Sequence, residues 1–124
     1  MITYKVTVDN YGTKRWYNEN DEYHRLDGPA IERANGSKEW RLNGKLHRLD
    51  GPAVEYADGR KEWWVNGEYH RLDGPAVERP DGDKEWYILD VYYTEEQFKA
   101  KIDAMNRPCK GKKIVVDGVE YTLA

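Results

Sequence analysis

The feature that most constrains this 124-residue chain is a unit that recurs every 23 residues. The heptapeptide His-Arg-Leu-Asp-Gly-Pro-Ala begins at His24, His47 and His70, and each copy continues to a turn and the tripeptide Lys-Glu-Trp. A fixed period of this length is typical of proteins that stack one supersecondary unit many times. We therefore expect a repeat architecture in which each unit buries its apolar side chains against its neighbours.

Each unit carries the signals of a β-hairpin. Short alternating runs flank a turn that ends in glycine in every copy: Asn35-Gly36, Asp58-Gly59 and Asp81-Gly82. Such pairs favour tight hairpin turns because both residues tolerate positive φ. The pattern predicts antiparallel strand pairs near residues 29–33 and 38–42, 52–56 and 61–65, and 75–79 and 84–89. The connection over residues 43–51 is predicted to be a longer structured loop that ends at Pro52, since proline belongs at the start or edge of a strand.

Both ends of the chain depart from this unit. Residues 1–23 read as a degenerate first copy with Trp16 in register, which suits a terminal cap. The run Thr94-Glu95-Glu96-Gln97 is a capping box, and the apolar spacing after it predicts a helix over 95–105. Asp117-Gly118 then marks a final hairpin. The predicted organisation is a repeat region, 1–93, and a cap, 94–124, packed on the repeat sheet, with repeat boundaries at 1–23, 24–46, 47–69 and 70–93.

Composition supports a thin, mainly β structure. Five Trp and ten Tyr stand against one Phe, and the mean hydropathy is -1.01. Broad aromatic rings cover one sheet face with few residues. The 20 basic and 23 acidic residues are interspersed, so nucleic acid is not an expected partner. No apolar run is long enough for a membrane span, and the single cysteine, Cys109, allows no intrachain disulfide, so we expect a cytoplasmic protein.

The residues of the repeat resemble a known family. Residues 58–70, Asp-Gly-Arg-Lys-Glu-Trp-Trp-Val-Asn-Gly-Glu-Tyr-His, resemble MORN-type repeats, and the His-Arg-Leu-Asp-Gly-Pro-Ala element is similar to a variant in small proteins of bacteriophages, bacteria and giant viruses. The 94–124 segment is similar to the C-terminal segment of some phage members. The resemblance implies an elongated, twisted antiparallel meander that makes protein–protein contacts. The loop is longer and poorer in glycine than the usual MORN loop, so the lipid binding of some members does not carry over.

The invariant loop offers an imidazole, a guanidinium and a carboxylate close together. One interpretation is loop architecture, in which Asp27, Asp50 and Asp73 cap turns and the arginines lie over tryptophan rings or pair with glutamate. The alternative is a small-ligand or nucleotide site built from these residues: His24, Arg25, His47, Arg48, His70 and Arg71. Three equal copies do not suit one catalytic centre, and the repeat spacing of about 9–10 Å is too long for shared metal ligands. We expect no enzyme activity, metal or cofactor.

The positions that differ between copies suggest a binding surface. Trp40, Trp63 and Trp86 are in register and are expected to line one face. The residues that follow them, Arg41, Trp64 and Tyr87, point to the opposite face, together with Arg33, Tyr56 and Arg79 from the facing strands. A constant scaffold with one varied face is typical of a recognition surface on a repeat protein.

These observations favour a non-enzymatic protein-binding module. We expect an inhibitor that docks on a host defence protein in the host cytoplasm, and the resemblance alone implies that it is encoded by a phage. A nucleotide-binding sponge and an oligomeric scaffold, including a homodimer, remain open alternatives.

Overall fold

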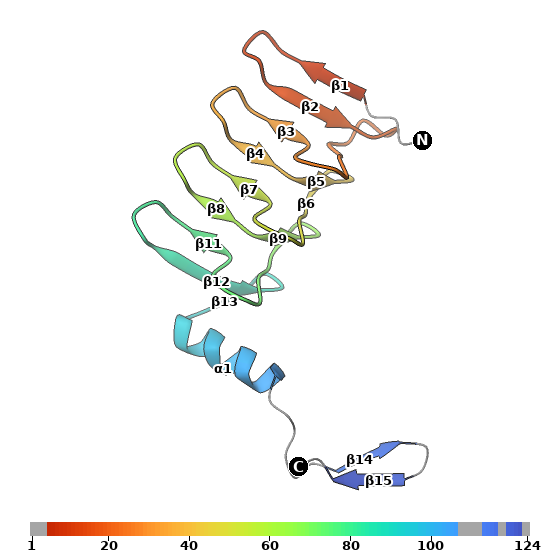
Figure 1. The fold of residues 1–124 in the computed structure, drawn as a ribbon, viewed down its shortest axis with the longest axis vertical. Helices are drawn as coiled ribbons and strands as arrows, with labels where there is room; N and C mark the ends of the chain where they lie inside the picture. Colours follow the sequence, from red (N-terminus) through yellow and green to blue (C-terminus); the bar gives the residue numbers. More distant parts are fainter. Residues whose placement is uncertain (1–4, 107–112, 117–118, 123–124) are drawn as a thin grey trace.

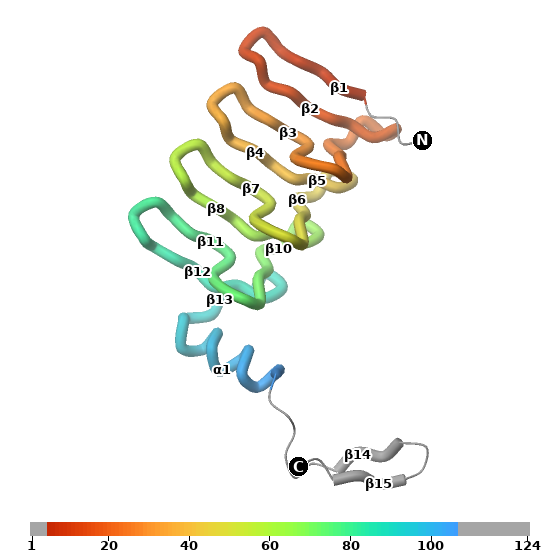
Figure 2. The backbone as a smooth tube through the Cα atoms, in the orientation of Figure 1, coloured from red at the N-terminus to blue at the C-terminus, as the bar shows by residue number. Residues whose placement is uncertain are grey.

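A computed structural model of the chain describes residues 5–106, 113–116 and 119–122. Hairpin units follow one another along the long axis, with β1 at one end of the stack and α1 beyond the other (Figure 1; Figure 2). The main sheet has nine strands in the order β1-β2-β3-β4-β7-β8-β11-β12-β13, and neighbouring strands are antiparallel. The predicted mainly β meander of tandem hairpins is confirmed.

The Gly-ended turns close the predicted hairpins. β1 (Lys5–Val8) pairs with β2 (Lys14–Tyr17), β3 (Ile31–Glu32) with β4 (Lys38–Glu39), β7 (Val54–Glu55) with β8 (Lys61–Glu62), and β11 (Val77–Glu78) with β12 (Lys84–Ile88). Gly36, Gly59 and Gly82 have φ of 95°, 100° and 96°, a conformation that favours glycine. The regular strands are shorter than the predicted ranges.

A second hairpin stands where we predicted a long loop. β5 (Arg41–Leu42) pairs with β6 (Lys45–Leu46), β9 (Trp64–Val65) pairs with β10 (Glu68–Tyr69), and the end of β12 pairs with β13 (Val91–Tyr93). Both turn residues have positive φ, for example 49° at Asn43 and 83° at Gly44. The loop prediction was therefore wrong over residues 43–46. Asn43-Gly44 forms a two-residue turn with positive φ at both positions, whereas in the first hairpin only the glycine, Gly36, has positive φ.

Backbone hydrogen bonds tie the second hairpins to one another. The Gly44 N–H donates to the Tyr23 carbonyl at 2.9 Å, and the Gly67 N–H donates to the Leu46 carbonyl at 2.8 Å. The Asp90 N–H donates to Tyr69 in the same way. Each repeat is thus linked to the next at both ends of its strands.

The strand register sorts the side chains onto two faces. Ile31 lies opposite Arg15 and Glu39, and this row continues through Val54, Glu62, Val77 and Glu85. The other row alternates in charge: Lys14, Glu32, Lys38, Glu55, Lys61, Glu78 and Lys84. Successive side chains of a strand point to opposite faces, so the second row lies on the same face as Trp16, Trp40, Trp63 and Trp86. We call this the tryptophan face.

The buried apolar core is narrow. Among the described residues, Ala30, Ala53 and Ala76 are fully buried, and each is followed by a buried Ile31, Val54 or Val77. Two small or β-branched residues per repeat therefore fill the centre. A buried core of so few residues agrees with the polar composition of the chain.

The helix α1 (Glu95–Asn106) caps the last repeat. The predicted capping box is present, because the Thr94 N–H donates to Gln97 Oε1 at 3.1 Å and the Gln97 N–H donates to Thr94 Oγ1 at 3.2 Å. Phe98 is buried, and its ring centroid lies 6.5 Å from that of Trp86. Phe98 therefore contacts Trp86 of the final hairpin, and α1 lies beyond β12 and β13 at the end of the stack (Figure 1).

The final hairpin is formed by β14 (Lys113–Val116) and β15 (Val119–Thr122). Its predicted packing on the repeat sheet, and the environment of Cys109, lie outside the described residues and side chains. Within residues 5–106, 113–116 and 119–122, no helix has the length and apolar character to cross a bilayer.

Candidate functional site

On the tryptophan face, each invariant loop builds a stacked arginine. The Arg48 guanidinium lies 3.8 Å from the centroid of the Trp40 ring, and the equivalent pairs are Arg25 with Trp16 at 4.0 Å and Arg71 with Trp63 at 3.8 Å. The Nε atom of Arg48 donates to Asp50 at 3.0 Å, and its Nη1 donates to the Pro52 carbonyl at 3.1 Å. The other two loops repeat both bonds. The arginine therefore joins the sheet to its own loop.

The loop glycine lies directly against this arginine. A Cβ atom built on Gly51 or Gly74 would stand 2.8 Å from the guanidinium carbon of Arg48 or Arg71, and at Gly28 the distance would be 3.0 Å. Real Cβ atoms almost never approach as closely as at Gly51 and Gly74, and the contact at Gly28 would be tighter than nine in ten real ones. The invariant glycine is thus explained by close packing on the arginine.

The loop histidine holds the next hairpin in place. Nδ1 of His24, His47 and His70 accepts a hydrogen bond from the backbone N–H of Asn43, Asn66 and Leu89, at 2.9, 3.0 and 3.0 Å. The donor is the first turn residue of the second hairpin in each case. The imidazole that accepts at Nδ1 carries its proton on Nε2.

These contacts agree with the prediction that the arginines lie over tryptophan rings. The predicted capping role of Asp27, Asp50 and Asp73 takes another form, because their carboxylates accept hydrogen bonds from the arginine Nε atoms. The six residues of the alternative ligand site, His24, Arg25, His47, Arg48, His70 and Arg71, are distributed one pair per repeat. Each pair takes part in the packing of its loop.

The opposite face collects the six residues predicted to bind a partner: Arg41, Trp64, Tyr87, Arg33, Tyr56 and Arg79. They surround a row of three invariant glutamates, Glu39, Glu62 and Glu85. Glu62 is only 4% exposed. Sequence reasoning missed the glutamates, although their position one residue before each tryptophan places them on this face.

Each glutamate accepts a hydrogen bond from the varied residue two positions later. Arg41 Nη2 donates to Glu39 Oε1 at 2.8 Å, Trp64 Nε1 donates to Glu62 Oε1 at 2.9 Å, and the Tyr87 hydroxyl donates to Glu85 Oε1 at 2.8 Å. Arginine, tryptophan and tyrosine differ in size and charge, but all three are donors. The position therefore varies within a physical limit, which is the need to satisfy a partly buried carboxylate.

A basic residue is a second partner of each glutamate. Arg33 pairs with Glu39 at 2.6 Å, and Arg79 pairs with Glu85. In the third copy a tyrosine, Tyr56, replaces this arginine, and Arg60 from the turn pairs with Glu62 at 2.6 Å instead. The Arg60 guanidinium also lies 5.5 Å from the Tyr56 ring centroid. One copy thus compensates for the missing arginine at another position.

The first copy contains the same pair with the charges exchanged. Arg15 occupies the place of the glutamate, as its register opposite Ile31 shows. Its partner is Asp9, which accepts from Arg15 Nη1 at 3.0 Å and stands in the place of Arg33 and Arg79. The ion pair is therefore retained across the face even where the residue types are reversed.

The varied residues meet aromatic side chains from the second hairpins. Ring centroids are 3.8 Å apart for Trp64 and Tyr69, 4.8 Å for Tyr69 and Tyr87, and 5.6 Å for Tyr87 and Tyr92. At the other end, Tyr17 lies 5.3 Å from Tyr23, and the Arg41 guanidinium lies 5.7 Å from the Tyr23 ring. We call this set the aromatic stripe: Tyr17, Tyr23, Arg41, Trp64, Tyr69, Tyr87 and Tyr92.

Tyr23, Tyr69 and Tyr92 were absent from the predicted site. The Asn66-Gly67 signal contained the necessary information, because a two-residue hairpin turn there places Tyr69 opposite Trp64. The prediction of loops over residues 43–51 and their equivalents contains no such pairing.

Contacts on the face that carries the aromatic stripe, which we call the stripe face, shift the pKa values of its titratable side chains. Burial alone would raise the pKa of Glu39, but hydrogen bonds from Arg33 and Arg41 lower it below its ordinary value of 4.5. The pKa of Glu85 is lowered in the same way, with Tyr87 and Arg79 as donors outweighing burial. Burial, together with the hydrogen bond to Glu85, raises the pKa of Tyr87 to about 12. The carboxylates stay charged and the tyrosine stays neutral near pH 7.

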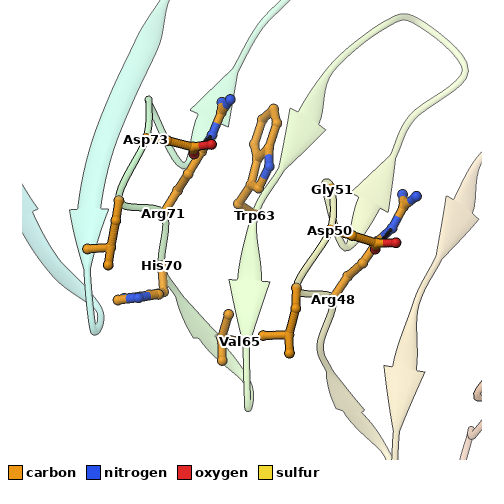
Figure 3. A pocket seen from close by; sticks show the side chains of 10 residues that line it. Arg48, Asp50, Gly51, Trp63, Val65, His70, Arg71 and Asp73 are labelled. Atoms are coloured by element: carbon orange, nitrogen blue, oxygen red, sulfur yellow. Dashed lines mark hydrogen bonds and ion pairs between the residues drawn. The ribbon is translucent and has the colours of Figure 1, made fainter.

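Grooves separate successive loops on the tryptophan face. One groove, of about 510 Å³, has Trp63 and Val65 at its floor and the loops of Arg48 and Arg71 at its sides (Figure 3). The equivalent groove one repeat earlier, of about 590 Å³, is lined by Trp40, Leu42 and the loops of Arg25 and Arg48. Leu49 lines both.

Within the described part of the chain, no group of three or more His, Cys, Asp or Glu residues is arranged to hold a metal ion. No protein-family model, curated protein or solved structure matches the chain.

Proposed function

We propose that the protein is a non-enzymatic binding module that docks on another protein through the aromatic stripe. The observation that carries the proposal is that side chains of the stripe contact one another across two repeat boundaries, Tyr69 with Tyr87 and Tyr23 with Arg41. Aromatic residues and arginine are the types enriched at the centres of protein interfaces. The stripe combines both on one face.

The rigidity of the stripe supports this function. Glu62 and Glu85 hold Trp64 and Tyr87 by hydrogen bonds, and both rings also pack against Tyr69. Side chains that are ordered before binding lose less conformational entropy when a partner arrives. Tyr92 and Tyr56, 56% and 41% exposed, offer contact area beside them.

The identity of the partner is a proposal that rests on resemblance. Similarity of the repeat to those of small phage proteins favours a phage-encoded inhibitor that binds and blocks a host defence protein. Direct docking suits a chain of this size, because steric blockage requires no chemistry of its own.

The test uses substitutions that keep the hydrogen bond to the glutamate. Trp64→Arg reproduces the residue of the second copy and removes an aromatic ring from the stripe. We expect proteins retained from a bacterial lysate by the immobilised full chain to be lost with Trp64→Arg and kept with Tyr11→Ala, which changes an 83% exposed tyrosine away from the stripe. A retained protein is then purified and titrated, and we expect Trp64→Arg to weaken its binding at least about tenfold.

Equal affinity of the wild-type chain and the Trp64→Arg variant would contradict the stripe as the docking surface. A parallel calorimetric titration with nucleotides examines the sponge alternative. Saturable nucleotide binding by the purified chain, lost on Arg48→Ala, would favour that alternative.

A further inference from the structure

The invariant loops leave one apolar side chain exposed at the same place in every copy. Leu26, Leu49 and Leu72 are 56%, 79% and 41% exposed. Single exposed leucines are common on proteins, but a row at the repeat period forms a surface. Each leucine precedes an aspartate, and we call these residues the loop ridge: Leu26, Asp27, Leu49, Asp50, Leu72 and Asp73.

The grooves between the loops give this ridge apolar recesses. Trp63 and Val65 form the floor of one groove (Figure 3). Leu49 and Leu72 are among the residues that line it. The end of the stack shows that this face accepts an apolar side chain, because Phe98 of α1 packs against Trp86, the next tryptophan in the row. An occupant would place one apolar side chain in each groove.

The spacing of the grooves selects the conformation of the occupant. Two strands per repeat at about 4.7–4.9 Å place successive grooves about 9.5 Å apart. A polyproline II segment advances about 9.3 Å in three residues and returns the same side to the surface. A helix returns near the same side after seven residues and about 10.5 Å, while residues three apart in a β-strand point to opposite faces. The polyproline II segment matches best.

Charge selects the residues that flank the apolar position. The side chains of Asp27, Asp50 and Asp73 are 73%, 87% and 86% exposed. The arginines that pair with them are only 20–23% exposed, so the ridge presents the carboxylates to solvent. A basic residue beside each apolar residue would complement them.

We propose that the loop ridge is a second docking surface, which binds a proline-rich, basic segment of a protein in polyproline II conformation with an apolar residue at every third position. This surface is on the opposite face from the aromatic stripe. The proposal therefore does not depend on the proposed function of the stripe.

The probe is a fluorescein-labelled peptide of five Leu-Pro-Lys triplets, titrated with the full chain by fluorescence anisotropy. We expect saturable binding, and Leu49→Gln should weaken it at least about fivefold because Leu49 lines both grooves. Leu26 and Leu72 each line one of these two grooves, so Leu26→Gln and Leu72→Gln should each have a smaller effect.

Three controls make the result specific. A peptide of the same composition without the three-residue period should bind at least about fivefold more weakly. Leu89→Gln, at a 59% exposed leucine outside the ridge, and Trp64→Arg, on the stripe face, should leave the affinity unchanged. Absence of saturable binding, equal binding of the scrambled peptide, or an unchanged affinity of Leu49→Gln would overturn the proposal.

Discussion

The two faces of the repeat sheet use arginine and carboxylate in different ways. On the tryptophan face, the residue types are constant: an arginine stacks on a tryptophan, pairs with an aspartate and presses against a glycine. On the stripe face, a constant glutamate accepts from arginine, tryptophan or tyrosine, according to the copy. On the tryptophan face the same residue types recur in each copy. On the stripe face the hydrogen bond to the glutamate recurs, but the residue that donates it differs.

This difference shows what constancy and variation mean within one repeat protein. The conspicuous His-Arg-Leu-Asp-Gly-Pro element is constant largely because its members pack on one another. The varied positions are limited only to donors, so they can differ without loss of the fold. A surface of that kind is free to acquire a binding specificity.

The largest expected effect is on the stripe face, at the buried carboxylate. Glu62→Ala leaves Arg60 without its ion pair and Trp64 without its acceptor, and we expect the free energy of unfolding in urea to fall by about 3 kcal/mol. Glu55→Ala is the matched control, because Glu55 lies in the alternating charged row of the other face and its loss should cost less than about 1 kcal/mol. Equal stability of the two variants would remove the distinction between the faces.

The next effect is on the tryptophan face, at the glycine contact. Gly51→Ala places a Cβ atom 2.8 Å from the Arg48 guanidinium carbon, so the arginine must shift from its position on Trp40. We expect a loss of about 2 kcal/mol in urea unfolding. In an Arg48→Ala background the same substitution should cost less than about 0.5 kcal/mol, since the clash is absent. An undiminished cost there would mean that glycine is required for another reason.

A smaller effect tests whether the stripe face retains interactions and not residue types. Arg79→Asp with Glu85→Arg converts the last copy to the Asp9, Arg15 and Tyr17 arrangement of the first. Each single substitution should destabilise the chain by about 1 kcal/mol, and the double variant should recover most of that loss. Urea denaturation of wild type, the two single variants and the double variant measures these losses. Strictly additive losses would show that the ion pair of the first copy cannot replace that of the last copy.

The smallest effect is at alkaline pH. The pKa of Tyr87 is raised to about 12 from its ordinary 10.0 by burial and by its hydrogen bond to Glu85, so the native state holds this proton more tightly than the unfolded chain. The resulting contribution to stability is complete below pH 10 and is lost as the pH rises through 12. The tyrosinate absorbance of the wild-type chain minus that of Tyr87→Phe should titrate near 12. A midpoint near 10 would show that Tyr87 is not held in this way.

Much of the fold could be predicted because one signal recurs. Three copies of a Gly-ended turn and a Lys-Glu-Trp strand determine the hairpins, and alternation along the strand assigns Arg41, Trp64 and Tyr87 to one face. The second hairpins were missed because Asn43-Gly44 was assigned to a loop. In the last copy Leu89-Asp90 makes the same turn without glycine, which residue preferences alone do not indicate.

The contacts that define the site depend on side-chain reach across the register. Tyr56 stands where other copies have an arginine, and Arg60, four residues later, pairs with the glutamate instead. In the first copy, Asp9 and Arg15 form the ion pair with the acidic and basic positions exchanged. Neither follows from periodicity. The packing of Phe98 on Trp86 depends on the direction in which α1 leaves the sheet, and that direction is set by tertiary contacts.

The most direct measurement of the central claim compares two substitutions at one position. Trp64→Arg keeps a donor for Glu62, as Arg41 does for Glu39, whereas Trp64→Leu keeps an apolar side chain and removes the donor. In urea unfolding we expect Trp64→Arg to remain within about 1 kcal/mol of wild type and Trp64→Leu to lose about 2 kcal/mol, the cost of an unsatisfied buried carboxylate oxygen. A Trp64→Leu variant as stable as Trp64→Arg would contradict the conclusion that the glutamates set the limit of variation on the stripe face.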